Sequence, residues 1–257
     1  MRHFLHKAGD SLLDLLYPRG CFACDALLGM DAPAAGDGAW LCSGCLETVV
    51  KIEAPYCSVC GEAFDGALTA PFRCWNCEER KLDFDFALSA CKAGGAVRDM
   101  IHAFKYHRNL AMRAPLADMM LPVFQDPRLA AEDLSQWLLM PVPLHPLRWI
   151  WRGYNQSAEL CRMLSRHTGM TVAHALARIR LTRPQAGLER RSRLKNLRGI
   201  FRLRRFPRLM RGRDLKGKNI FLVDDVLTTG ATTHECARVL KRQAGVEKVV
   251  VITAARG

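Results

Sequence analysis

Eight of the eleven cysteines in this 257-residue chain fall in four pairs of the form CxxC. Two cysteines separated by two residues on a tight turn can direct both sulfurs at one ion, and two such turns complete a tetrahedral zinc site of four thiolates. Because cysteine fills every position and none is left open for water, we expect two structural zinc ions. The pairs are Cys21/Cys24, Cys42/Cys45, Cys57/Cys60 and Cys74/Cys77.

The spacing leaves several features of these sites open. The four pairs can share zinc in sequence, the first with the second and the third with the fourth, or as an interleaved cross-brace. An iron–sulfur cluster, or a segment that has lost its metal, is the alternative to zinc. Trp40 and Trp75 stand beside cysteines; we expect them to pack around the metal, with stacking on nucleic-acid bases as the alternative. Zinc is expected to hold this segment together, because it is poor in large apolar residues.

Two adjacent acids end an apolar run near the C-terminus, and a Thr- and Gly-rich stretch follows them. Residues 219–233 are NIFLVDDVLTTGATT, with Asp224 and Asp225 at the end of a predicted strand. Ligands of α/β sheets bind at that edge, and a loop that opens a helix offers N–H groups and hydroxyls to a phosphate. The carboxylates would repel a phosphate, so they suit ribose hydroxyls, as hydrogen-bond acceptors.

The alternative to a ligand site is an ordinary strand–turn–helix, in which Asp225 is a turn residue and Thr229 or Thr232 caps the helix. The combination of two acids, a Thr/Gly loop and a helix in this order favours the phosphate site. Other phosphate loops fit less well, since the chain has no GxxxxGK[ST] and no GxGxxG that opens a helix after a strand.

Residues 86–257 show the alternation of strands and helices that is typical of an α/β domain with a largely parallel sheet. Residues 1–85 are expected to form a separate N-terminal helix and double zinc-ribbon region. Strands are predicted at 87–92, 137–143, 176–181, 199–204, 219–225 and 248–254, and helices at 96–106, after Asn109, at 155–167 and at 232–243.

The positive charge of the chain is concentrated in one block. The net charge is +13, and residues 178–218 hold sixteen lysines and arginines against two acids, Glu189 and Asp214. This block therefore carries about +14, and the rest of the chain about −1. A block of this kind is usually a solvated face or a loop, but its density favours an anionic partner: pyrophosphate, a nucleotide or nucleic acid.

Composition places the chain among globular proteins of a reducing compartment. No apolar run approaches the eighteen or so residues that span a bilayer, and the N-terminus lacks the cleavage site of a secretory signal. Clustered CxxC pairs suit a cytosol that keeps thiols reduced. We therefore expect a cytoplasmic protein without a membrane span.

Beyond these local patterns, the chain resembles the ComF/GntX family, which joins an N-terminal zinc-ribbon region to a type I phosphoribosyltransferase domain. The acid pair and the loop after it look like the family's phosphoribosyl pyrophosphate (PRPP) loop. Three further segments are similar over nearly the full length: LLDLLYPRGCFAC (12–24), PVPLHPLRWIWRGYNQSAEL (141–160), and TRPQAGLERRSRLKNLRGIF (182–201), in which Gln185, Leu188, Arg193, Asn196 and Phe201 match.

The resemblance implies roles for the matching residues. Asp224 and Asp225 would bind the ribose hydroxyls, and the 143–153 loop would face the pyrophosphate through Arg148 and Arg152. Segment 183–198 would close over the site, where Arg193 would stabilise charge on the departing pyrophosphate. Magnesium would arrive with PRPP rather than occupy a protein cage. The loop residues that would hold the 5′-phosphate are Thr228, Thr229, Gly230, Ala231 and Thr232.

Two functions of different classes follow from the resemblance. One is a phosphoribosyltransferase, in which an acceptor attacks C1 of PRPP and pyrophosphate leaves. The other is a non-catalytic protein of DNA uptake and competence that handles single-stranded DNA or senses a nucleotide with the same cradle, in contact with DNA-uptake proteins. Little sequence follows the last predicted strand, so the zinc region could replace a separate hood over the acceptor. His145 and His234 are expected to be structural or solvent-facing, and no catalytic base is assigned.

Overall fold

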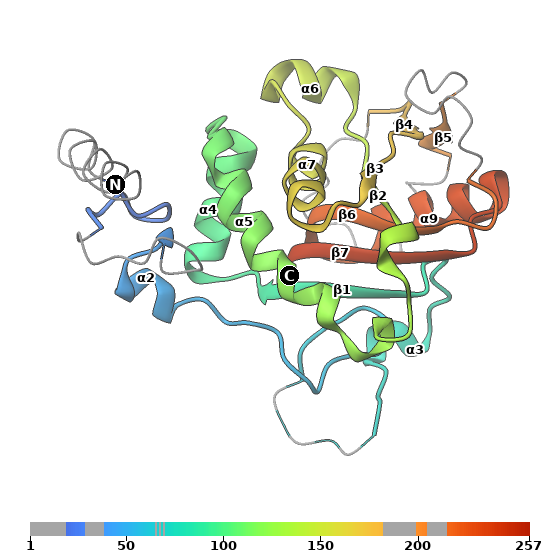
Figure 1. Cartoon of the computed structure of the whole chain (residues 1–257), viewed down its shortest axis with the longest axis horizontal. Helices are drawn as coiled ribbons and strands as arrows, with labels where there is room; N and C mark the ends of the chain where they lie inside the picture. The colour runs from blue at the N-terminus through green and yellow to red at the C-terminus, as the bar shows by residue number, and fades with distance from the viewer. Residues whose placement is uncertain are drawn as a thin grey trace, which may run out of the picture.

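The computed structural model of the chain is built around a five-stranded sheet in which every neighbouring pair of strands is parallel (Figure 1). It describes residues 19–28, 39–64, 66, 68, 70–181, 199–204 and 215–257. The strand order β1-β7-β6-β2-β3 confirms the predicted α/β class. The strands are β1 (Phe86–Lys92), β2 (Leu138–Pro141), β3 (Thr171–Val172), β6 (Asn219–Leu227) and β7 (Lys248–Arg256).

Helices cover both faces of the sheet, and so its central strands are apolar on both sides. Phe221 and Val223 of β6 face a core shared with α4, α5 and α7. Ile220 and Leu222, one position out of phase, face a core shared with α9. The helices are α4 (Gly95–Tyr106), α5 (Arg113–Met120), α7 (Gln156–Thr168) and α9 (Ala231–Ala244).

The predicted helices form where their periodicity and caps place them. In α7 the Asn155 side chain accepts a hydrogen bond from Ser157 N, and Gly169 ends the helix in the left-handed conformation, as is common for glycine after a last turn. Four short 3-10 segments lie between α4 and β2: Leu110–Met112, Leu121–Gln125, Pro127–Leu129 and Leu134–Gln136.

Two predicted strands do not join the parallel sheet. β4 (Leu176–Arg178) and β5 (Phe201–Leu203) pair antiparallel with each other in a separate two-stranded sheet. The pair flanks the segment 182–198, which lies outside the described residues. The buried side chains of Phe201 and Leu176 pack this two-stranded sheet against the core shared with α9. The apolar runs predicted that both segments are strands. Which strands pair with each other depends on tertiary packing, which the runs do not specify.

The proline-led loop predicted for 143–153 contains a helix. This helix, α6 (Pro146–Arg152), starts with proline at its first position, and the His145 side chain accepts a hydrogen bond from Leu147 N. Gly153 ends the helix at φ 84°. Proline at the start and glycine just past the end are typical helix boundaries. The expectation of a loop was therefore wrong over these residues.

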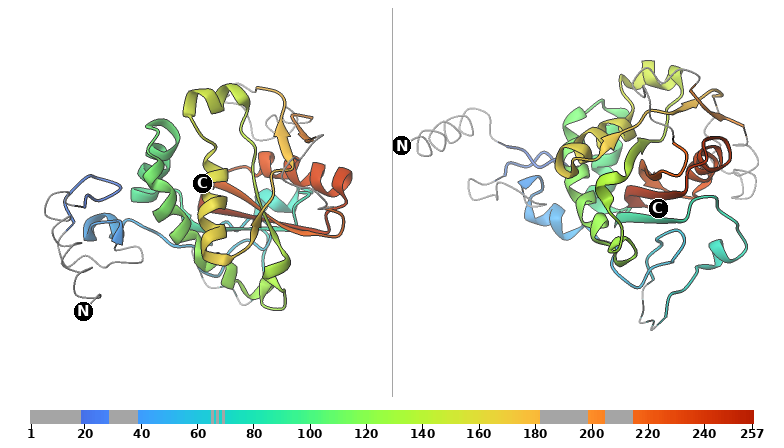
Figure 2. Two further views of the ribbon diagram at one scale, coloured as in Figure 1. Left: turned by 45° about the horizontal axis from the view of Figure 1, so that its top comes forward. Right: turned by 45° about the vertical axis from the view of Figure 1, so that its right-hand side comes forward.

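The two zinc-ribbon segments attach at different places. The first, with α2 (Ser43–Glu47), lies beside α4 and α5, where Trp40 Nε1 donates to Asp118 Oδ2 at 3.1 Å (Figure 2). The second, with α3 (Trp75–Glu78), lies along edge strand β1, where Ala87 N donates to Val59 O at 2.8 Å. An uncovered edge strand invites pairing with other chains, and the second ribbon covers this one.

Gly61 shows how closely the second ribbon meets β1. Its φ is +66°, and a Cβ at this position would lie 2.8 Å from Ala87 O. A residue without a side chain is needed for both reasons.

None of the helices in the described ranges has the length and the apolar character that a membrane span requires.

Candidate functional site

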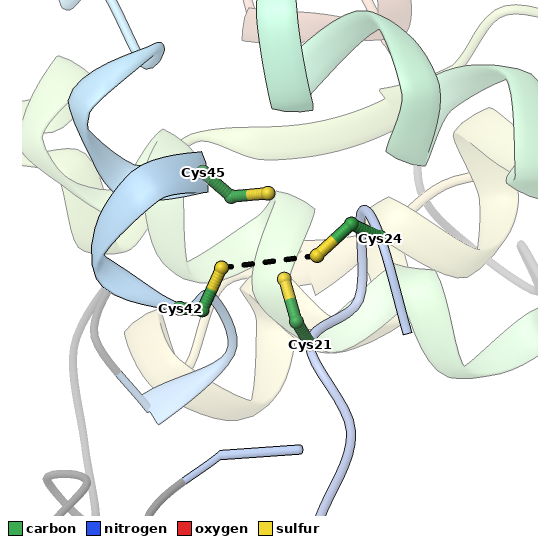
Figure 3. A group of neighbouring side chains, drawn as sticks. All are labelled: Cys21, Cys24, Cys42 and Cys45. Carbon is green, nitrogen blue, oxygen red and sulfur yellow. Dashed lines mark hydrogen bonds between the residues drawn. The ribbon is translucent and has the colours of Figure 1, made fainter. Parts of the chain in front are cut away.

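The eight paired cysteines form two groups of four, and each group closes around one point; Figure 3 shows the first group. The first group holds Cys21, Cys24, Cys42 and Cys45, and the second holds Cys57, Cys60, Cys74 and Cys77. Within each group all sulfurs lie within 4.8 Å of one another. The pairs therefore combine in sequence, and the cross-brace alternative is excluded.

The sulfur spacing fits zinc. Cys24 Sγ and Cys42 Sγ are 3.8 Å apart in the first group, and Cys60 Sγ and Cys74 Sγ are 3.7 Å apart in the second. A tetrahedron with Zn–S bonds of about 2.3 Å has sulfurs about 3.8 Å apart. Both groups are therefore compatible with structural zinc, and a four-thiolate set leaves no position for substrate.

The two tryptophans beside the cysteines differ. Trp40 packs edge-on against Phe22, with ring centroids 5.3 Å apart, as the packing prediction expects. Trp75 is 72% exposed, so the prediction that it packs around the metal is wrong, and the stacking alternative stays a prediction.

The acid pair lies within β6, which extends two residues beyond it to Leu227. Lys105 of α4 forms an ion pair with Asp225, with Nζ and Oδ1 3.0 Å apart. Ser157 of α7 donates its hydroxyl to Asp224 Oδ1 at 2.9 Å. Asp225 is only 5% exposed. Each acid is thus held by a different helix from elsewhere in the sequence.

The charges that lie close together at the acid pair change the pKa of Asp224 and of Lys105. Burial and the neighbouring Asp225 raise the pKa of Asp224 to about 7, although Lys105 acts in the opposite direction. Burial lowers the pKa of Lys105, but the two aspartates outweigh it, and the net effect is a raised pKa. Lys105 therefore stays charged, and Asp224 changes charge near neutral pH.

The loop after β6 has the geometry of an anion cradle. Gly230 adopts φ 71° and precedes the first residue of α9, so the N–H groups of the first helical turn face the loop. Thr229 Oγ1 accepts from Ala231 N at 3.4 Å, and Thr233 Oγ1 donates to Gly230 O at 3.0 Å. A helix N-terminus of this kind favours a phosphate.

Arginines gather around α6 and β4. Burial lowers the pKa of Arg148, and the nearby Arg152 lowers it further. Burial, followed by Arg148, also lowers the pKa of Arg178. Arg152 lies over the Tyr106 ring, 5.4 Å from its centroid, and donates from Nη1 to Gln156 Oε1 at 3.1 Å. Guanidinium groups this close together favour a nearby anion, because an anion relieves their mutual repulsion.

The structure brings some of the predicted site residues together and leaves others outside the described ranges. Asp224, Asp225 and the loop lie together as expected, and Arg148 and Arg152 lie together on α6. Arg193 and the closing segment 183–198 fall outside the described residues. Lys105 and Ser157, which reach β6 from α4 and α7, were not predicted, and Arg178 was given no role of its own.

The two histidines set aside as structural have structural partners. His145 Nδ1 accepts from Leu147 N at the start of α6, at 3.2 Å. His234 Nδ1 accepts from Asp83 N at 3.0 Å. Burial lowers the pKa of His234.

Comparisons with known proteins find a family model for the zinc-ribbon region and relatives that match most of the chain. The family model of the double zinc ribbon domain matches residues 12–78. Competence protein F of Haemophilus influenzae is 29% identical over 217 residues, which cover 84% of this chain and 90% of that protein. DNA utilization protein YhgH of Salmonella typhi is 30% identical over 206 residues, which cover 79% of this chain and 84% of that protein.

Among solved structures, the hypoxanthine-guanine phosphoribosyl transferase of L. donovani overlaps 61% of this chain and 71% of its own, with 15% identity and a TM-score of 0.31.

The first prediction concerns the metal. Purified, reduced protein should contain two zinc ions per chain, because two closed four-sulfur groups are present. Cys57→Ser should lower the content to one, and chelation should disorder the ribbons while the parallel sheet persists. Elemental analysis and hydrogen exchange measure these effects. A content of one or zero zinc in fully reduced wild-type protein would contradict the two-site structure.

The second prediction concerns pH. The pKa of Asp224 is about 7 in the folded protein and about 3.9 in an unfolded chain. Between these values the folded state binds more protons, so this group's contribution to the free energy of unfolding falls as pH rises from about 4 to 7. Asp224→Asn should therefore gain stability relative to wild type between pH 5 and pH 8, by about 2–3 kcal/mol, since each unit of pKa shift corresponds to about 1.4 kcal/mol.

Urea unfolding at several pH values measures this difference. Lys105→Met should move the midpoint to higher pH, because Lys105 lowers the pKa of Asp224. Asp99→Asn, an exposed substitution on the same helix as Lys105, serves as the control. A constant difference between Asp224→Asn and wild type across this range would contradict the raised pKa.

Proposed function

The chain belongs to the ComF/GntX family, and from this membership and the β6–α9 geometry we propose that it binds magnesium-PRPP and transfers the phosphoribosyl group to an acceptor. The observation that carries the proposal is one strand, β6, in which a half-buried Asp224 and a buried Asp225 lie shortly before a Thr- and Gly-rich loop that opens a helix. A ligand with a phosphate next to ribose hydroxyls fits this order of groups.

The proposed ribose contacts use the acid pair. Asp224 and Asp225 would accept hydrogen bonds from the two ring hydroxyls, and Lys105 would hold Asp225 in place through their ion pair. Thr228 through Thr232 would hold the 5′-phosphate with N–H groups and hydroxyls at the start of α9. Binding is then strongest above the pKa of Asp224, where both acids accept.

The proposed pyrophosphate contacts come from the arginines. Arg148, Arg152 and Arg178 would lie against the pyrophosphate, whose negative charge would offset that of their cluster. Arg193, on the proposed closing segment, would join them on closure. In the reaction, an electron pair of the acceptor forms the new bond to C1 while the C1–O bond to pyrophosphate breaks. The arginines and the Mg²⁺ carried by PRPP stabilise the leaving group.

We further propose a role in competence and DNA utilization, with single-stranded DNA and DNA-uptake proteins as partners and the cytoplasm as the location. The names of the related proteins support the role, and the reduced cysteine groups support the compartment. The specific observation for DNA is the basic block of residues 178–218, whose charge of about +14 exceeds what one pyrophosphate requires. A protein that handles DNA without turnover is the second candidate.

The acid pair provides the test of PRPP binding. Asp224→Asn combined with Asp225→Asn should weaken binding of magnesium-PRPP at least roughly tenfold, since each hydrogen bond to a charged group contributes about 1.5–3 kcal/mol. Isothermal titration measures the affinity, with Asp99→Asn as the control for loss of a surface charge. Pyrophosphate release with a panel of acceptors then separates a transferase from a protein that only binds. Unchanged affinity in the folded double variant rules out the ribose assignment.

The basic block provides the test of DNA binding. Removing charge at Arg191 and Arg193 should damage turnover and leave DNA binding nearly intact. Removing Arg202, Arg205, Arg208 and Arg211 should weaken binding of single-stranded DNA, and its log–log salt slope should become shallower by about 0.7 for each phosphate that the protein no longer neutralises. Salt titrations of an oligonucleotide measure both sets. If the second set lowers PRPP affinity and leaves the salt slope unchanged, this division of the block is wrong.

A further inference from the structure

The last residue of β7, Arg256, joins the second zinc ribbon to the phosphate loop. Its Nη1 donates to Leu227 O at 3.1 Å and to Thr228 O at 2.8 Å. Its Nη2 donates to Glu62 Oε2 at 2.7 Å and to Cys60 Sγ at 3.6 Å. The side chain is only 10% exposed. One guanidinium therefore contacts a metal-ligand sulfur and the backbone of the loop at the same time.

These contacts orient the loop's donors. In a planar trans peptide the carbonyl of one residue and the N–H of the next point in opposite directions. The carbonyls of Leu227 and Thr228 point at Arg256, so the N–H groups of Thr228 and Thr229 point away from it. Arg256 thus fixes the direction of two N–H groups on the side of the loop that faces away from it.

The sulfur contact links this arrangement to the metal. Four thiolates around one Zn²⁺ carry a net charge of −2, and Arg256 is placed to offset part of it through Cys60. Hydrogen bonds to metal-ligand atoms fix the orientation of both partners. Without zinc, the sulfurs of the second group lose the charge and the position that hold the guanidinium.

The second ribbon also lies directly against the loop. A narrow crevice has Asn76, Cys77 and Arg80 of the ribbon on one side and Thr228, Thr229 and Gly230 on the other. The first ribbon has a different environment, since Thr48 Oγ1 accepts from Ala96 N at 2.9 Å, at the start of α4. The same protein therefore contains one zinc group at the loop and one that packs on helices.

We propose that Arg256 is a positioning residue through which zinc in the second group and a phosphate-bearing ligand on the loop stabilise each other. The proposal rests on the proposed function for the identity of that ligand, PRPP. Coupling of two binding equilibria is reciprocal, so the ligand raises zinc affinity by the factor by which zinc raises ligand affinity. The first zinc group is not coupled.

A chelator competition with site-resolved detection tests the coupling. Wild-type protein is equilibrated with a chelator selective for zinc over magnesium, with and without saturating magnesium-PRPP. Freed cysteines are alkylated and mapped by peptide mass spectrometry. We expect the apparent zinc affinity of the second group to rise at least about fivefold, with no change at the first. An equal response of both groups, or none, overturns the proposal.

Variants locate the coupling in the Arg256 bridge. Arg256→Ala and Glu62→Gln should each reduce the ligand-induced gain in zinc affinity, and Arg256→Lys should restore part of it. Glu62 is 42% exposed at its side chain, so Glu62→Gln tests the bridge even if Arg256→Ala does not fold. Glu132→Gln removes the partner of Lys248 at the opposite end of β7 and should behave as wild type. A full gain in folded Arg256→Ala overturns the role of Arg256.

A ligand-free measurement separates this proposal from the proposed function. Removal of zinc from the second group should increase hydrogen exchange of residues 226–232 in wild type, and much less in Arg256→Ala, whose loop is already released. If wild type does not bind magnesium-PRPP, the proposed function fails, and this exchange result alone decides whether zinc holds the loop. Unchanged exchange after zinc removal overturns the proposal whether or not PRPP binds.

Discussion

Two adjacent carboxylates inside the central strand of a sheet impose the main constraint on this protein. Asp225 is 5% exposed and Asp224 has a pKa of about 7, so both must be compensated by nearby groups. Lys105 supplies a charge and Ser157 supplies a hydroxyl. These partners require α4 and α7 to pack on the same face of the sheet, close to the end of β6. An acid pair with one member buried and the other half-buried, which costs stability when ionised, is typical of a binding site rather than of a core.

Local sequence patterns predicted those features that depend on residues close together in the chain. The CxxC spacing predicted both four-cysteine groups, and the order of strand, acids, loop and helix predicted the position of β6 and α9. Proline at the start of α6 and glycine just past its end are also local signals, and they are typical of a helix. The antiparallel pairing of β4 with β5, by contrast, depends on which strands remain available after the parallel sheet forms. Lys105 could not be found because 120 residues of chain separate it from Asp225, and only packing brings them together.

The second ribbon contacts the sheet at two places, the edge strand β1 and the C-terminal end of β7. It covers β1, the edge strand next to β7, through backbone contacts at Ala87 and Gly61. It also reaches the C-terminal end of β7, where Arg256 meets the loop after β6. A small metal-stabilised segment suits this position, because it has little apolar core of its own and depends on the surface that it covers. The predicted boundary at residue 85 separates the paired-cysteine region from the region of alternating strands and helices. In the structure, however, the two regions contact each other extensively.

The order of strands also bears on the kind of ligand proposed for the site. β6 lies between β7 and β2. The loop with its N–H donors and Arg256 lies on the β7 side, and the arginines of α6 follow β2. The carboxylates of β6 therefore stand between two regions that attract anions, and they repel an anion themselves. A compact single anion gains from only one of the two regions. A ligand with hydroxyls in its middle and phosphates at both ends would gain from all three, and PRPP, the ligand proposed above, has this distribution of charge.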